Sequence, residues 1–170
     1  MGFDEKIKQL RKKIEDALLP LIDSDYVLWD CPYHNNIGDI LIWQGEIEFL
    51  QKLKYKCLDY ASKDTCRFPK LSEEVVILLH GGGNFGDLWQ EHQAFRLKII
   101  QAYPNNRIII FPQTVYYQDE VMMRQDVQIM AEHDNLIICA RDQKSYEILK
   151  MHFANTILLL PDMAFCISYK

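Results

Sequence analysis

Short apolar runs alternate with longer segments of helical periodicity along nearly the whole chain, and this alternation restricts the fold more than any other feature. Six runs are predicted as buried strands: Tyr26–Asp30, Tyr55–Asp59, Val75–His80, Arg107–Phe111, Leu136–Ala140 and Thr156–Leu160. The segments between them predict helices over Asp39–Leu53, Asp87–Tyr103, Gln118–His133 and Asp142–Phe153. Continuous apolar strands belong in a sheet that is covered on both faces, and strict strand–helix succession requires right-handed crossovers. The sequence therefore predicts an α/β fold with a doubly wound parallel sheet of about six strands.

One further helix is predicted at the start of the chain, at about 4–22. Its apolar residues recur at helical spacing: Ile7, Leu10, Ile14, Leu18 and Leu21. Basic residues interrupt this segment, so it has no apolar core of the signal-peptide type. We expect it to pack at the edge of a single domain spanning 1–170, and peripheral association with a membrane surface is the alternative.

Composition narrows the class of protein. Of the 170 residues, 49% are hydrophobic and 25% are charged, which is typical of a soluble globular domain large enough to bury its own core. The net charge of −5 argues against a nucleic-acid partner. The five cysteines lie far apart without zinc spacing, which favours reduced thiols and a cytoplasmic location. The carboxylates are also scattered, so the sequence predicts no metal site.

Polar segments follow five of the six predicted strands. Ligands of open parallel sheets bind beyond the carboxyl ends of the strands, near the point where the strand order reverses. The segments at that edge are Cys31–Asp39, Gly81–Asp87, Pro112–Thr114, Arg141–Ser145 and Pro161–Phe165. We expect them to converge on one ligand site.

The glycines of the second segment fit the spacing G-x-G-x-x-G at Gly81, Gly83 and Gly86. Glycine lets a ligand approach the backbone, and a following helix presents free N–H groups to an anion. Dinucleotide binding is disfavoured, because the motif follows the third strand and the next strand ends without a carboxylate for a ribose. A tight packing turn remains one interpretation. An anion-binding loop with Asn84 as side-chain donor is the other.

Charged residues at this edge each have two interpretations. Asp39, after Asn36 and Gly38, is either the N-cap of its helix or a carboxylate that orients or deprotonates a substrate hydroxyl. Arg141 suits a phosphate or carboxylate, and its alternative is an ion pair with Asp162 or Asp39. Helix capping is preferred for two other aspartates, Asp87 and Asp142, the second of which has Ser145 three residues on.

Several neutral or titratable side chains are also candidates. His80 is either a buried core histidine or an acid–base group, and Gln113 could hydrogen-bond a sugar or carboxylate. Trp43 and Trp89 could stack on a sugar ring, with core packing as the alternative. Of the remaining histidines, His34 is expected at the surface and His92 in partly buried packing. Neither a serine-hydrolase elbow nor a P-loop is present.

Five motifs together resemble the polysaccharide pyruvyl transferases, most closely the branch found in bacterial exopolysaccharide gene clusters. They occur in the same order as in that family and cover nearly the whole chain. The motifs are NNIGDILIWQGEIEFL (Asn35–Leu50), HGGGNFGDLW (His80–Trp89), FPQTVYY (Phe111–Tyr117), ARDQKSYEIL (Ala140–Leu149) and LPDMAF (Leu160–Phe165).

The resemblance implies transfer of pyruvate from phosphoenolpyruvate onto two hydroxyls of one sugar, as a cyclic ketal, in exopolysaccharide biosynthesis. It also implies a fold of two Rossmann-like halves, similar to the GT-B glycosyltransferases, with the site between them. Members of that family are about twice as long, so this chain would be the amino-terminal half and lack the second domain. We therefore expect the chain to fold but to transfer no pyruvate by itself.

Site residues carried over from the resemblance begin with Asp39 as the base, Gly81, Gly82, Gly83 and Asn84 as the ligand loop, and Arg141 as an anion ligand. His80 joins Asp39 and Arg141 as a candidate catalytic residue. The remaining candidates for substrate binding are Asn36, Gly38, Gln113, Ser145 and Asp162. The expected donor is phosphoenolpyruvate without any cofactor, and the expected acceptor is a saccharide or a lipid-linked oligosaccharide.

Two other functions are compatible with the sequence. One is half of a sugar-nucleotide glycosyltransferase. The other is a non-catalytic binding or assembly module, which predicts an exposed apolar face near Ile157–Tyr169 and a homodimer through that face.

Overall fold

A computed structural model describes residues 2–33 and 36–168. Fourteen elements follow one another within these residues. They are α1 (Phe3–Leu18), η1 (Leu19–Leu21), β1 (Tyr26–Trp29), α2 (Ile37–Leu50), β2 (Cys57–Ala61), β3 (Val76–Leu79), β4 (Gly82–Gly86), α3 (Gln90–Ala102), β5 (Ile108–Tyr116), α4 (Glu120–Ala131), β6 (Leu136–Ala140), α5 (Gln143–His152), β7 (Thr156–Leu159) and η2 (Met163–Cys166). The helix–strand alternation predicted from the sequence is confirmed, with boundaries that shift by a few residues.

The sheet is parallel throughout and has the strand order β2-β1-β3-β5-β6-β7. The order reverses between β1 and β3, because the chain moves outward from β1 to β2 and then crosses back to the other side of β1. The predicted doubly wound α/β fold is therefore confirmed. In such a sheet the reversal point marks the edge where a ligand site forms.

An additional strand, β4, was not predicted. Strand β5 is nine residues long; its first half pairs with β3 and its second half pairs with β4. The glycine segment therefore continues the sheet beyond β3 instead of turning directly into a helix. The expectation that these glycines form the turn at a helix N-terminus is wrong, since α3 begins only at Gln90 with Trp89 as its N-cap.

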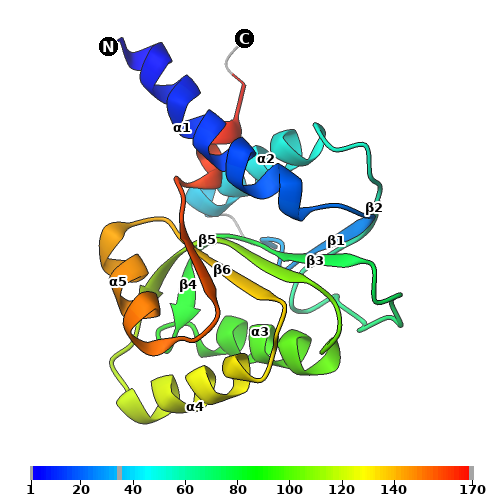
Figure 1. Cartoon of the computed structure of the whole chain (residues 1–170), viewed down its shortest axis with the longest axis vertical. Coiled ribbons are helices and arrows are strands. Elements are labelled where there is room, and N and C mark those ends of the chain that lie inside the picture. Colours follow the sequence, from blue (N-terminus) through cyan, green and yellow to red (C-terminus); the bar gives the residue numbers. More distant parts are fainter. Residues whose placement is uncertain (1, 34–35, 169–170) are drawn as a thin grey trace.

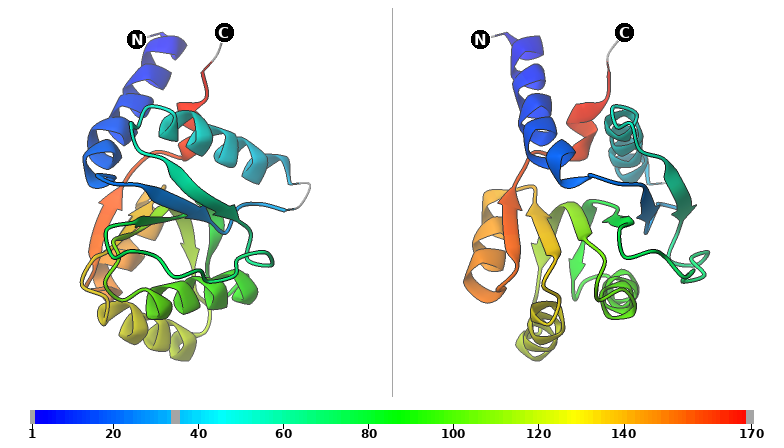
Figure 2. Two further views of the ribbon diagram at one scale, coloured as in Figure 1. Left: turned by 90° about the vertical axis from the view of Figure 1, so that its right-hand side faces the viewer. Right: turned by 45° about the vertical axis from the view of Figure 1, so that its right-hand side comes forward.

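Helices cover both faces of the sheet (Figures 1 and 2). Helices α1 and α2 and the short η2 lie over one face, and α3, α4 and α5 lie over the other. Along β3 the side chains alternate between these layers: Val76 and Leu78 pack under α2, whereas Ile77 and Leu79 face α3. All four are almost completely buried. This double coverage explains why the strands are continuous apolar runs.

The amino-terminal helix ends earlier than predicted. Helix α1 stops at Leu18, and Leu19–Leu21 form a 3-10 turn that contains Pro20. Proline has no N–H to donate to the preceding turn, which explains the end of the α-helix there.

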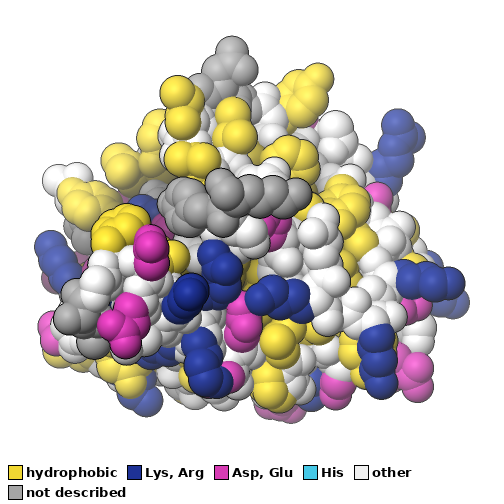
Figure 3. Space-filling view, turned by 90° about the horizontal axis from the view of Figure 1, so that it is seen from above, with side chains coloured by type: hydrophobic (Ala, Val, Ile, Leu, Met, Phe, Trp, Pro, Cys, Tyr) yellow, Lys and Arg dark blue, Asp and Glu magenta, His cyan; other side chains and the backbone are white. Residues whose placement is uncertain are grey.

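Viewed from above, Lys and Arg side chains lie among Asp and Glu side chains, and hydrophobic side chains gather toward one border of the face (Figure 3). Among the described residues, no helix is long and apolar enough to cross a bilayer.

The carboxyl-terminal segment is packed rather than exposed. Ile157, Leu160, Met163 and Cys166 are buried, and Cys166 and Met163 belong to the layer formed with α1 and α2. Over 157–168, the described part of the segment, the expectation of a large exposed apolar face is therefore wrong. The prediction of a homodimer stays a prediction.

Candidate functional site

A cavity of about 460 Å³ lies at the carboxyl edge of the sheet. Four separate parts of the chain line it: the β1–α2 connection with the first turns of α2, strand β4, the start of α3, and the turn after β6. The lining residues are Asn36, Gly38, Asp39, Ile42, Gly83, Asn84, Trp89, His92 and Arg141. Three of the five predicted segments thus meet at one cavity, and six of these nine residues are among the predicted site residues.

Arg141 contributes the main positive charge of the cavity. Its Nε donates to Thr114 Oγ1 at 2.8 Å, and its Nη1 donates to Asp162 Oδ2 at 2.8 Å. A Cβ atom placed on Gly83 would lie 3.3 Å from Nη2, so this third nitrogen faces the glycine in the cavity wall. The predicted ion pair with Asp162 is present. It engages only one nitrogen of the guanidinium, so Nη2 remains available to an anion.

Asn84 is held by buried groups behind the cavity wall. Its backbone N–H donates to Gln113 Oε1 at 3.2 Å, and its Oδ1 accepts from Arg96 Nη2 at 2.6 Å. Arg96 is 1% exposed and lies over the Phe85 ring, 5.0 Å from its centroid. Because Asn84 Oδ1 already accepts from Arg96, the side-chain nitrogen Nδ2 is the group that can donate to a ligand.

Six of the twelve predicted site residues do not line the cavity, and three of them, Gln113, Ser145 and Asp162, form hydrogen bonds within the scaffold. Gln113 is completely buried and donates from Nε2 to the His80 carbonyl at 2.8 Å. Ser145 is also buried, accepts from Val115 N at 2.8 Å and donates to Asp142 Oδ2 at 2.9 Å. Asp162 lies beyond Arg141, where its other oxygen accepts from Ala164 N and caps η2. Each satisfies hydrogen bonds of the scaffold in this structure, and its role in substrate binding stays a prediction.

Of the three aspartates considered as helix caps, one caps the helix that follows it. Asp142 caps α5 as predicted. Asp87 does not cap α3; its Oδ2 accepts from the backbone of Gln118 and Asp119 just before α4. For Asp39 both interpretations had remained open. The N-cap of α2 is Asn36, whose side chain accepts from Gly38 N at 2.9 Å, so Asp39 falls inside the first turn and lines the cavity.

His80 is buried behind the glycine segment and pairs with a carboxylate that the sequence did not reveal. His80 Nδ1 lies 2.8 Å from Glu46 Oε2, and Glu46 Oε1 accepts from Gly81 N at 2.8 Å. Both side chains are almost inaccessible to solvent. This position matches the interpretation of His80 as a buried core histidine. Gly81 and Gly82 also stand outside the cavity lining, although a Cβ on Gly82 would lie 3.4 Å from Asp39 Oδ1.

The buried pair predicts a pH dependence of stability. Burial by itself lowers the pKa of His80, but the charge and hydrogen bond of Glu46, with Asp30 and Asp39 nearby, raise that pKa above the usual value. A raised folded-state pKa means stabilisation that is complete below about pH 6.5 and is lost as the pH rises through the folded value. We expect the urea midpoint of the wild type to fall across that window.

Glu46→Gln is the matched variant for this prediction. A glutamine still accepts from Gly81 and donates to a neutral imidazole, but it carries no charge. We expect a flatter dependence of the unfolding free energy on pH in this variant. Parallel curves for wild type and variant, measured by urea denaturation between about pH 6 and 9, would contradict the assignment.

The sequence also failed to reveal a second carboxylate–histidine pair. His92 Nδ1 lies 2.7 Å from Asp30 Oδ1, and the His92 ring is in the cavity lining. His92 had been assigned to packing because it lies near the apolar side of its helix. Trp89, 57% exposed, lies beside it and can stack on a ring, whereas Trp43 is partly buried in the core. His34 lies outside the described residues.

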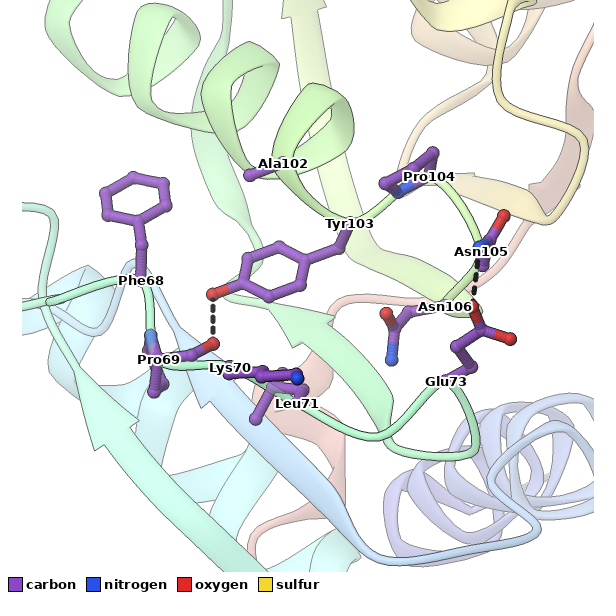
Figure 4. Close-up of a pocket in the computed structure, with 10 residues that line it drawn as sticks. All are labelled: Phe68, Pro69, Lys70, Leu71, Glu73, Ala102, Tyr103, Pro104, Asn105 and Asn106. Carbon is purple, nitrogen blue, oxygen red and sulfur yellow. Dashed lines mark hydrogen bonds between the residues drawn. The ribbon is translucent and has the colours of Figure 1, made fainter.

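A different cavity, of about 330 Å³, lies at the amino-terminal ends of β3 and β5 (Figure 4). Its polar groups are paired with one another: the Tyr103 hydroxyl donates to the Pro69 carbonyl at 2.8 Å, and Asn105 Nδ2 donates to Glu73 at 2.7 Å. These pairs leave few groups for a ligand. Within the described residues, no group of three or more His, Cys, Asp or Glu side chains could hold a metal ion.

The fold is of the doubly wound α/β class, and the cavity lies where the strand order reverses, which is where proteins of this class bind their ligands. Residues 36–169 match the polysaccharide pyruvyl transferase family. The chain belongs to this family, which confirms the resemblance seen in the five motifs.

Individual relatives agree with this assignment. The chain is 37% identical over 170 residues to the Bacillus subtilis (strain 168) protein named "Putative pyruvyl transferase EpsO", covering 96% of this chain and 52% of that protein. It is 32% identical over 147 residues to "Pyruvyl transferase 1" of Schizosaccharomyces pombe, covering 79% of this chain and 36% of that protein. The chain thus spans about half or less of the length of these two relatives.

A solved structure has the same fold. The crystal structure of an uncharacterized protein from Klebsiella pneumoniae superposes with a TM-score of 0.70 over 95% of this chain and 58% of that chain. The two sequences are 17% identical, so this similarity concerns the fold alone.

Proposed function

We propose that this chain is part of an enzyme that transfers pyruvate from phosphoenolpyruvate to two hydroxyls of one sugar, in the synthesis of an exopolysaccharide. Membership of the polysaccharide pyruvyl transferase family supports the reaction. The observation that carries the proposal is the cavity itself, in which a guanidinium, an amide and a carboxylate from three separate segments come together: Arg141, Asn84 and Asp39.

The reaction makes specific demands on such a site. A proton is added to the methylene carbon of the enol, and a sugar hydroxyl attacks the adjacent carbon. The bond to phosphate then breaks, and the second hydroxyl closes the ketal. The two hydroxyls lose two protons in total. One balances the proton gained by the carbon that becomes the methyl group, and the other is taken up by the departing phosphate. A site for this chemistry needs cationic and N–H donors for the anionic donor substrate, and a base for the hydroxyls.

The residues of the cavity can meet these demands. Arg141 Nη2 and the amide nitrogen of Asn84 are donors suited to a phosphate or carboxylate. The proposed base is Asp39, which lines the same cavity. Trp89 offers an exposed ring on which a sugar can stack. Neither a metal nor a cofactor has a role in this scheme.

The proposed acceptor is a saccharide or a lipid-linked oligosaccharide, and the proposed compartment is the cytoplasm. Large apolar side chains are exposed in two segments that also contribute residues to the cavity lining: Tyr33 and Ile37 in the first, and Leu88 and Trp89 in the second. Because the relatives extend well beyond the aligned part, we propose that a second half of the enzyme covers this surface and completes the site.

The proposal predicts selective binding of the donor. We expect calorimetric titration of the 170-residue chain to detect phosphoenolpyruvate and to detect nucleotide sugars more weakly or not at all. We also expect no ketal when the chain is incubated with phosphoenolpyruvate and a saccharide, because half of the site is supplied elsewhere.

The outcomes separate the alternatives. Preferred binding of a nucleotide sugar would favour a glycosyltransferase and contradict the proposed donor. Ketal formation by the chain alone would support the reaction and contradict the need for a second half. Binding of neither compound, with a stable dimer in light scattering, would favour the assembly module.

A further inference from the structure

Asp30 adopts a left-handed backbone conformation, which is uncommon for a residue with a side chain. It follows directly after β1 and has a φ of 63°. Aspartate and asparagine enter this region more readily than other non-glycine residues. The Asp30 side chain is held almost completely buried, at 2% exposure. Such a conformation next to a ligand cavity suggests that the position of this carboxylate matters.

The carboxylate determines which nitrogen of His92 carries a proton. Asp30 Oδ1 lies 2.7 Å from His92 Nδ1, and an ionised carboxylate can only accept a hydrogen bond. Nδ1 must therefore be the donor. In a neutral ring this leaves the lone pair on Nε2. Within 2–33 and 36–168, no hydrogen bond engages Nε2, and the ring lies in the cavity lining.

A buried cation lies behind the carboxylate. Arg96 Nη2 is 3.9 Å from Asp30 Oδ2, and both side chains are at least 98% buried. Among the described residues, Asp30 Oδ2 has no hydrogen-bond partner. The guanidinium thus places an opposite charge beside this buried carboxylate. Arg96 also donates to Asn84, so it supports one residue of the cavity lining directly and a second, His92, through Asp30.

We propose that Asp30 is a positioning residue that selects the Nδ1–H tautomer of His92, so that His92 Nε2 faces the cavity as a proton acceptor. Neutral histidine in water prefers the opposite tautomer, with the proton on Nε2. The pairing thus converts a side chain that would present a donor into one that presents a base. A carboxylate behind the ring also stabilises the imidazolium that forms when Nε2 takes a proton.

A ring with an unprotonated Nε2 can accept a proton from a substrate group. A sugar hydroxyl is a group of this kind. The role in ketal formation rests on the proposed function, whereas the tautomer does not. Ketal formation removes protons from two hydroxyls, and the cavity would then hold two acceptors, Asp39 and His92. In the closing step the proton moves from the second hydroxyl oxygen to Nε2 as that oxygen bonds to the cationic carbon left by the departure of phosphate, and the released phosphate then takes up the proton.

Nitrogen-15 NMR of the imidazole rings tests the tautomer directly, at about pH 9, where histidine is ordinarily neutral. His133 is an internal control of opposite type: its Nε2 lies 3.0 Å from the Tyr103 carbonyl and its Nδ1 accepts from Asn135 N at 3.3 Å. We expect mainly Nδ1–H for His92 and mainly Nε2–H for His133. A wild-type His92 with mainly Nε2–H would overturn the proposal, whether or not the chain binds phosphoenolpyruvate.

Two variants of Asp30 complete the test. Asp30→Gly removes the carboxylate and tolerates the left-handed backbone, so His92 should change to mainly Nε2–H while His133 stays unchanged. Asp30→Asn preserves the volume and also tolerates this backbone. Its amide can donate as well as accept, so we expect a smaller Nδ1–H fraction than in the wild type. An unchanged His92 tautomer in both folded variants would overturn the assignment to Asp30.

Discussion

Replacing Arg141 by alanine should weaken the binding of phosphoenolpyruvate by about 30- to 1,000-fold. This range corresponds to about 2–4 kcal/mol, the usual loss when one partner of a partly buried, charged hydrogen-bonded pair is removed. Arg141 is 29% exposed and already oriented by Thr114 and Asp162, so its third nitrogen needs little reorganisation to meet an anion. Calorimetric titration of wild type and variant measures the difference.

Two further variants distinguish an anion ligand from a structural ion pair. Arg141→Lys keeps the charge but cannot bond Thr114, Asp162 and a ligand in one plane, so we expect an intermediate loss. Asp162→Asn keeps the size of the side chain and its ability to cap η2, and it removes a competing negative charge. Affinity should be unchanged or higher in this variant. Equal losses in Arg141→Ala and Asp162→Asn would show that the arginine serves only the ion pair.

Replacing Gly86 by alanine should lower the free energy of unfolding by about 3 kcal/mol or more. Gly86 has a φ of +112°, and a Cβ at this position would lie 1.8 Å from the Tyr116 carbonyl oxygen. Both atoms belong to the β4–β5 pairing, so the contact cannot be relieved by rotating a side chain. A loss of this size lowers the melting temperature by roughly 10 °C in a domain of this length.

Gly83→Ala is the matched control, because it lies in the same strand. Its backbone is not in the positive-φ region, and the nearest atom to a new Cβ is the movable Arg141 Nη2 at 3.3 Å. We expect a change in stability of less than about 1 kcal/mol, with weaker phosphoenolpyruvate binding because the methyl group enters the cavity. Equal destabilisation of the two variants in thermal and urea unfolding would contradict this account of β4.

Fold class could be predicted because it depends on local periodicity. The strand Leu136–Ala140 was predicted with its observed bounds, since a fully buried parallel strand leaves a continuous apolar run in the sequence. Asp142 was recognised as a cap for a similar reason: its hydrogen bond to Ser145 N spans three residues. Strand β4 leaves no such pattern. Four residues of GGNFG are polar or glycine, and they form a strand because β5 extends far enough to pair with them.

The candidate site was predicted only in part. The switch-point rule brought Asn36, Gly83 and Arg141 to one edge without any knowledge of side-chain contacts. It could not show which polar side chains turn inward, so Gln113 and Ser145 were placed at the surface although both are buried. The direction of a side chain at a strand end depends on the neighbours that pack on it.

The sequence by itself determined the parallel sheet, its helices, the edge that bears the cavity and the family, because each depends on local pattern or on motifs in order. The tertiary structure alone decided the two carboxylate–histidine pairs, Glu46 with His80 and Asp30 with His92. Their partners lie 34 and 62 residues apart in the chain. No local spacing brings such residues together; they meet because the crossovers place α2 and α3 against the ends of β1 and β3.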